Sequence, residues 1–139
     1  MHFSQSLAEA TEEERTIAKA FVDARLQGAT LRAYPGSMPA GRESAYRIQD
    51  LAITSWPEPI AGWKTTMLIP PEYGSDFVGR RLIGPAFRSS IRLARSGEWT
   101  DIPVIAGGFS GLEPEVVVRV ACDAPAGKLD WTIDEAREM

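Results

Sequence analysis

The sequence predicts an α+β protein in which helices come first and strands follow. Two patterns support this class: apolar residues recur at helical spacing before Trp56, and the hydrophobic period falls towards two after it. Because the helical and strand patterns do not alternate, we do not expect an α/β sheet. The 139 residues are enough for one hydrophobic core. We divide them into an N-terminal helical segment, residues 1–57, and a partial β-rich domain, residues 58–139.

The first predicted helix begins after Thr11 and ends near Gly28. Thr11 and Glu14 have the spacing of a capping box, in which each side chain accepts from the backbone N–H of the other residue. Ile17 and Phe21 then recur at a helical interval, and Gly28 is a typical residue just past a helix end. This pattern indicates an amphipathic helix.

A second helix is predicted over Glu43–Ile53, with Ala45, Ile48 and Leu51 on one face. The prolines of Trp56–Pro59 end it, because proline lacks the N–H that a continuing helix needs.

Strands are predicted over Ile60–Ile69, Ser89–Ala94 and Glu115–Asp123, where the period is close to two. Thr132 and Glu135 form a second capping box just before the last residue of the sequence. A helix of about two turns is marginal unless it is packed. We therefore expect either a short docked helix or a helix that continues in a longer protein.

Composition excludes several classes of function. The net charge of −4 disfavours broad nucleic-acid binding, which depends on clustered Lys and Arg. No apolar run approaches the roughly 20 residues of a membrane span, and the N-terminus lacks a secretory pattern, so we expect a cytoplasmic protein without membrane contact. His2 and Cys122 are the only residues of their kinds. Cysteine–histidine catalysis and zinc–cysteine sites are therefore not expected, and a bound metal would need mostly oxygen ligands.

Glu113 and Glu115 are candidate metal ligands. Residues two apart on a strand project to the same face, so the two carboxylates would stand together. Two such groups repel each other unless a cation neutralises them. A divalent metal does so, but a solvated strand end or a pairing with arginine explains the same spacing.

Lys64 is the candidate substrate-binding and catalytic residue. On a strand it shares a face with Ile60, Thr66 and Leu68, which places an ammonium group in a mostly apolar row. A lysine in this setting can bind a carboxylate or, with a lowered pKa, transfer protons. The alternative is a lysine whose ammonium reaches solvent from an edge strand.

Four segments in order resemble the 2-keto-4-pentenoate hydratase group of the fumarylacetoacetate hydrolase superfamily. They are "SAYRIQDLAI", "PIAGWKTT", "RLIGPAF" and "LEPEVVVRVA". The resemblance runs from about Thr11 to the end of the sequence, and its most specific feature is Gly-Trp-Lys followed about fifty residues later by Glu-x-Glu.

The resemblance implies a fumarylacetoacetate hydrolase-like fold and a metal-dependent hydratase, a lyase acting on a small 2-oxo acid such as 2-oxopent-4-enoate in aromatic compound degradation. It assigns Mg²⁺ or Mn²⁺ binding to Glu113 and Glu115, and substrate binding and proton transfer to Lys64. A bound Lewis acid stabilises the enolate that such chemistry forms. We also expect a homo-oligomer, because core left exposed favours self-association.

Two departures from the family pattern leave alternatives open. Ala86 replaces an aspartate that is an acid–base candidate in many hydratases, and relatives supply a third metal carboxylate beyond this C-terminus. We therefore expect a truncated chain with an incomplete site. A related decarboxylase or C–C hydrolase, or a non-catalytic binding or assembly module that retains the fold, remains an alternative.

Overall fold

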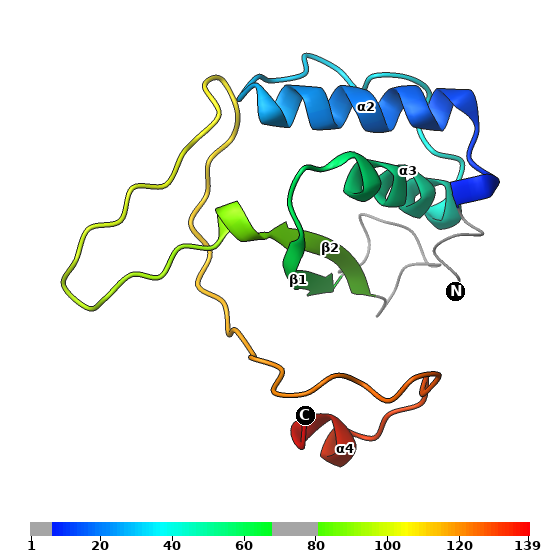
Figure 1. Ribbon diagram of the computed structural model, residues 1–139. Coiled ribbons are helices and arrows are strands. Elements are labelled where there is room, and N and C mark those ends of the chain that lie inside the picture. The colour runs from blue at the N-terminus through cyan, green and yellow to red at the C-terminus, as the bar shows by residue number, and fades with distance from the viewer. Residues whose placement is uncertain (1–6, 68–80) are drawn as a thin grey trace.

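The computed structural model describes residues 7–67 and 81–139. With the labels of Figure 1, the elements in chain order are α2 (Glu12–Leu26), α3 (Arg42–Ser55), β1 (Ile60–Met67), β2 (Arg81–Phe87), a 3₁₀ turn (Arg88–Ser90) and α4 (Ile133–Arg137). The two long helices precede the strands and the short α4 follows them, so the predicted α+β class is confirmed.

Helix α2 begins and ends where the sequence predicts. The Glu14 N–H donates to Thr11 Oγ1 at 3.1 Å, and the Thr11 N–H donates to Glu14 Oε2 at 2.9 Å, which completes the capping box. Beyond the last turn, Gly28 has a φ of +63°, a left-handed conformation that glycine adopts without steric cost.

The hydrophobic core lies between α2 and α3. Its buried residues are Ile17, Ala18, Ile48 and Leu51. The predicted apolar faces are confirmed at Ile17, Ile48 and Leu51, but the predicted Ala45 is exposed. Phe21 is 40% exposed and instead packs edge-on against Tyr34, with ring centroids 5.5 Å apart. Helix α3 also ends before Trp56, as the prolines that follow predict.

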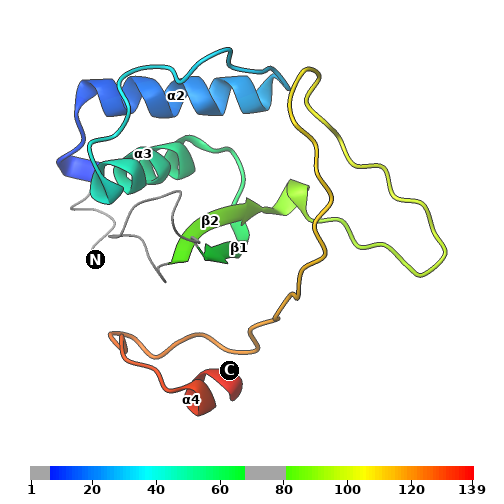
Figure 2. The ribbon, with the colours of Figure 1, turned by 180° about the vertical axis from the view of Figure 1, so that it is seen from behind.

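Strands β1 and β2 form an antiparallel hairpin that lies on the side of α3 away from α2 (Figures 1 and 2). Two contacts hold it there. Phe87, only 4% exposed, stacks on Trp56 at a centroid distance of 4.8 Å. The Ile83 N–H donates to the Tyr46 hydroxyl at 3.1 Å. The second half of the helical segment therefore positions the hairpin.

The predicted strand at Ile60–Ile69 is confirmed as far as Met67, and its last two residues lie outside the described ones. Strand β2 was not predicted from periodicity, because Gly84 and Pro85 interrupt it. Pro85 nevertheless pairs with Trp63. Proline is tolerated on an edge strand, and both strands of a two-stranded sheet are edges.

The strands predicted over Ser89–Ala94 and Glu115–Asp123 are wrong. The first region is a 3₁₀ turn followed by irregular chain, and the second is irregular throughout. Both have the right side-chain pattern, but a strand also needs a neighbour for its backbone N–H and C=O groups. Among the described residues the sheet contains only β1 and β2, so the expected β-rich portion reduces to one hairpin. The remaining chain follows a long open path (Figures 1 and 2).

The second predicted capping box is also confirmed. The Glu135 N–H donates to Thr132 Oγ1 at 3.2 Å, and the Thr132 N–H donates to Glu135 Oε2 at 2.9 Å. Local contacts support this short helix, α4: Lys128 pairs with Glu135 and lies 4.8 Å from the Trp131 ring centroid.

Candidate functional site

Lys64 lies in the middle of β1, directly opposite Gly84 of β2. Directly opposite residues of an antiparallel pair share a face, so Gly62 and its partner Ala86 lie on the same face as Lys64. A Cβ placed on Gly62 or Gly84 would meet no atom within 4 Å. The lysine side chain therefore stands beside a floor of very small residues, with room above it.

The structure brings all three predicted site residues together. Lys64 Nζ lies 2.8 Å from Glu113 Oε2 and 2.9 Å from Glu115 Oε1. The two glutamates thus face one ammonium group, although both lie about fifty residues after Lys64 in the sequence. The side chains of the cluster are about half exposed or more, so ligands can reach it.

The contacts shift two pKa values in directions that favour the charged forms. The hydrogen bond from Lys64 lowers the pKa of Glu113, and the hydrogen bonds to Glu113 and Glu115 raise the pKa of Lys64. The ammonium therefore stays protonated at neutral pH. This arrangement suits binding of an anion, and it differs from the lowered pKa that a lysine acting as a base requires.

The expected strand geometry does not explain how the glutamates meet. Glu113 and Glu115 flank Pro114 in irregular chain, where the predicted strand face is absent. The cation of Lys64 neutralises their repulsion instead. The three candidate residues therefore lie together through long-range ion pairs, not through a shared strand face.

The cluster also provides a partial fit for a divalent metal. Two carboxylates are hard oxygen ligands, and Mg²⁺ is commonly held by one or two carboxylates, with water and substrate oxygens completing the shell. Within residues 7–67 and 81–139, no group of three or more His, Cys, Asp or Glu residues is placed to hold a metal. Glu113 and Glu115 therefore fit a weak, open site in which the metal would take the place of the Lys64 ammonium.

Sequence reasoning missed a second charged cluster, between α2 and α3. Glu14 is 6% exposed and accepts from Ser44 Oγ at 2.7 Å and from Arg47 Nη2 at 2.9 Å. The hydrogen bond from Arg47 is the main cause that lowers the pKa of Glu14 to about 2. Glu14 was interpreted only as a capping residue, and nothing in its spacing to Arg47 signals a long-range pair.

Sequence reasoning also missed a cavity of about 550 Å³ beside α3, lined by Arg42, Tyr46 and Gln49 among others. Tyr46 and Gln49 lie in "SAYRIQDLAI", one of the four segments that carry the resemblance. Their spacing of three residues, together with Arg42 four residues earlier, places all three on one helix face. That signal was available in the sequence.

The fold and the site define a small α+β protein in which the Lys64 ammonium pairs with the carboxylates of Glu113 and Glu115. Comparisons with protein-family models, with curated proteins and with solved structures find no match to this chain. Among the described residues, no helix combines the length and the apolar content that crossing a membrane requires.

Proposed function

We propose that this chain provides part of the active site of a metal-dependent enzyme acting on a small 2-oxo acid, with hydration of a 2-oxo-alkenoate such as 2-oxopent-4-enoate as the reaction. The observation that carries the proposal is the contact of Lys64 Nζ with Glu113 at 2.8 Å and with Glu115 at 2.9 Å. The resemblance to 2-keto-4-pentenoate hydratases selects these same three residues.

In this proposal Lys64 binds the substrate carboxylate. Its ammonium is protonated and accessible, and it borders the floor formed by Gly62 and Gly84. A flat 2-oxo acid fits over glycines better than over larger side chains. The lysine then orients the substrate through a charge-assisted hydrogen bond.

Glu113 and Glu115 hold Mg²⁺ or Mn²⁺ in this proposal. When bound, the metal supplies Lewis-acid stabilisation of negative charge that develops on the 2-oxo group. Because two carboxylates alone bind such a cation weakly, a chelating 2-oxo acid should strengthen its binding. Release of Lys64 from the glutamates frees the ammonium for the substrate.

The test uses Mn²⁺ as a paramagnetic probe of the 139-residue chain, observed through its amide resonances by NMR. We expect Mn²⁺ to broaden the amides of Glu113 and Glu115 selectively, and pyruvate to increase that broadening. The double change Glu113→Gln and Glu115→Gln removes both ligands and should abolish the selective effect. Turnover of 2-hydroxypenta-2,4-dienoate, with oxaloacetate and acylpyruvates as comparators, then identifies the reaction.

The matched control is Glu98→Gln, which removes an exposed carboxylate from the same irregular part of the chain. It should leave the Mn²⁺ effect unchanged. Equal broadening in the double variant and the control would overturn the metal assignment, because it would mean that Mn²⁺ is attracted only by general negative charge.

A non-catalytic binding or assembly module is the second candidate function, and two observations favour it. Ala86 lies on the Lys64 face, where the hydratases carry an acid–base aspartate, so this chain lacks a carboxyl group there. In addition, many large apolar side chains between Leu93 and Val120 are exposed. Such surface commonly marks contact with another protein.

A further inference from the structure

The cavity beside α3 has the composition of a ligand site. Its volume of about 550 Å³ is within the usual range for small-molecule pockets, which are mostly apolar with a few convergent polar groups. The wall comes from the loop before α3 and from the start of β2, and consists of Met38, Pro39, Ala40, Leu82 and Ile83. These residues are separate from the Lys64 cluster.

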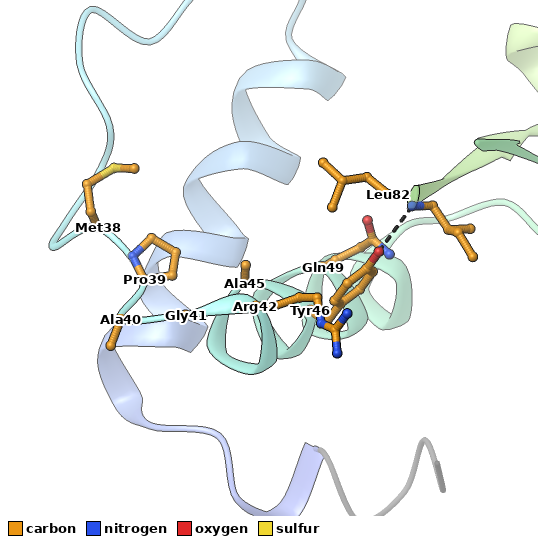
Figure 3. Close-up of a pocket in the computed structure, with 10 residues that line it drawn as sticks. Met38, Pro39, Ala40, Gly41, Arg42, Ala45, Tyr46, Gln49 and Leu82 are labelled. Carbon is orange, nitrogen blue, oxygen red and sulfur yellow. Dashed lines mark hydrogen bonds between the residues drawn. The ribbon is translucent and has the colours of Figure 1, made fainter. Parts of the chain in front are cut away.

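Three polar side chains of α3 line the same cavity: Arg42, Tyr46 and Gln49. Figure 3 shows Tyr46 and Gln49 projecting from the helix towards Leu82. The Tyr46 oxygen accepts from the Ile83 N–H, so its own O–H proton remains available to a ligand. Within the described residues, no hydrogen bond or ion pair engages the side chain of Arg42 or Gln49.

We propose that this cavity binds a small monocarboxylate with a flat or branched apolar body, of the benzoate type. The guanidinium of Arg42 binds the carboxylate, which it can engage through two parallel N–H donors. The apolar body lies against Leu82 and Ile83, and Tyr46 and Gln49 donate to an oxygen of the ligand. Among the described residues that line the cavity, Arg42 is the only cation, so it selects an anion over a neutral analogue.

The test is an NMR titration of the full chain with benzoate, with benzyl alcohol as the neutral analogue and acetate as the anion without an apolar body. The Ile83 amide, which donates to Tyr46, reports occupancy of the cavity directly. We expect saturable shifts of Ile83 and of cavity residues with benzoate, and much weaker binding of benzyl alcohol and acetate. Arg42→Gln should weaken benzoate binding about tenfold, the usual effect of losing one hydrogen bond to a charged group.

Two further variants keep the result interpretable. Arg92→Gln removes an exposed arginine from irregular chain and should leave benzoate binding unchanged. Ala45→Met places a larger side chain on the cavity wall, and methionine is a good helix former, so α3 should stay intact. This variant should block benzoate binding while the rest of the spectrum remains that of the folded protein.

Three outcomes would overturn the proposal: no saturable shift at Ile83, equal binding of benzoate and benzyl alcohol, or benzoate shifts centred on Lys64 and Glu113. The last outcome would mean that benzoate binds at the metal-site lysine. The Mn²⁺ experiment does not involve Arg42, so the two proposals stand or fall separately.

Discussion

Glu14 shows how much one residue contributes to this small core. Its carboxylate accepts hydrogen bonds from Thr11, Ser44 and Arg47 while only 6% of the residue is exposed. A buried charge is stable only when its partners compensate for lost hydration. Here those partners come from both helices, so the residue that caps α2 also joins α2 to α3.

We predict that Glu14→Gln destabilises the protein by about 3 kcal/mol, because it leaves Arg47 without its charged partner. The same pair makes stability depend on pH. Glu14 has a pKa of about 2 in the folded protein against an ordinary value of 4.5. A lowered folded pKa gives stability that is fully present above the unfolded pKa and is lost as pH falls from about 4.5 towards 2.

Urea unfolding at pH 7, 4 and 3 measures both effects. The Glu14→Gln protein should lose less stability between pH 7 and 3 than the unchanged protein does. Glu12→Gln, in the same first turn but exposed, serves as the control and should keep the original pH dependence. An unchanged pH profile in Glu14→Gln would contradict the prediction.

Sequence reasoning named Lys64, Glu113 and Glu115 as candidate site residues, but it did not predict the ion pairs that join them. Local signals, such as the two capping boxes and Gly28, gave correct helix ends because they depend on neighbours only a few residues away. The pairing of Glu14 with Arg47 depends on how α2 and α3 pack, which sequence spacing does not encode. The strand over Glu115–Asp123 failed for the same reason: alternation is local, but a strand needs a partner.

At the scale of elements, the hairpin depends on few anchors. Phe87 is the one buried residue of β1 and β2, and it stacks on Trp56 at the end of α3. The Arg25 guanidinium lies 5.2 Å from the Trp56 ring centroid, which links this stack to α2. The helices have their own core, so the hairpin should be able to detach while α2 and α3 stay packed.

We predict that Phe87→Ala destabilises the hairpin by about 3 kcal/mol, a usual result of removing a buried aromatic ring. Hydrogen exchange should show lost protection in β1 and β2, with protection in α2 and α3 largely retained. Leu93→Ala is the matched control, because Leu93 is 96% exposed and its truncation removes little packing. Equal loss of protection in helices and hairpin would mean that the described elements unfold as one unit.

At the scale of the whole molecule, the chain after β2 is the least buried part. The most exposed large apolar side chains of this segment are each at least 89% exposed: Leu93, Trp99, Phe109, Leu112, Val116 and Val117. The core between α2 and α3 is small by comparison. So much exposed apolar surface favours association with other chains, and irregular chain rich in valine can pair its free backbone groups with another strand.

We therefore predict concentration-dependent self-association, measured by light scattering coupled to size-exclusion chromatography. Val116→Lys combined with Val118→Lys should shift the protein towards monomer, because charge on this segment opposes strand pairing. Leu26→Lys is the control: Leu26 is 53% exposed at the end of α2, outside the segment, and its change should leave association unaltered. If the protein without substitutions stays monomeric at all concentrations, that result would contradict the prediction and weaken the assembly role. The Mn²⁺ response of Glu113 and Glu115 is measured at a fixed protein concentration, so it tests the enzymatic role independently of this outcome.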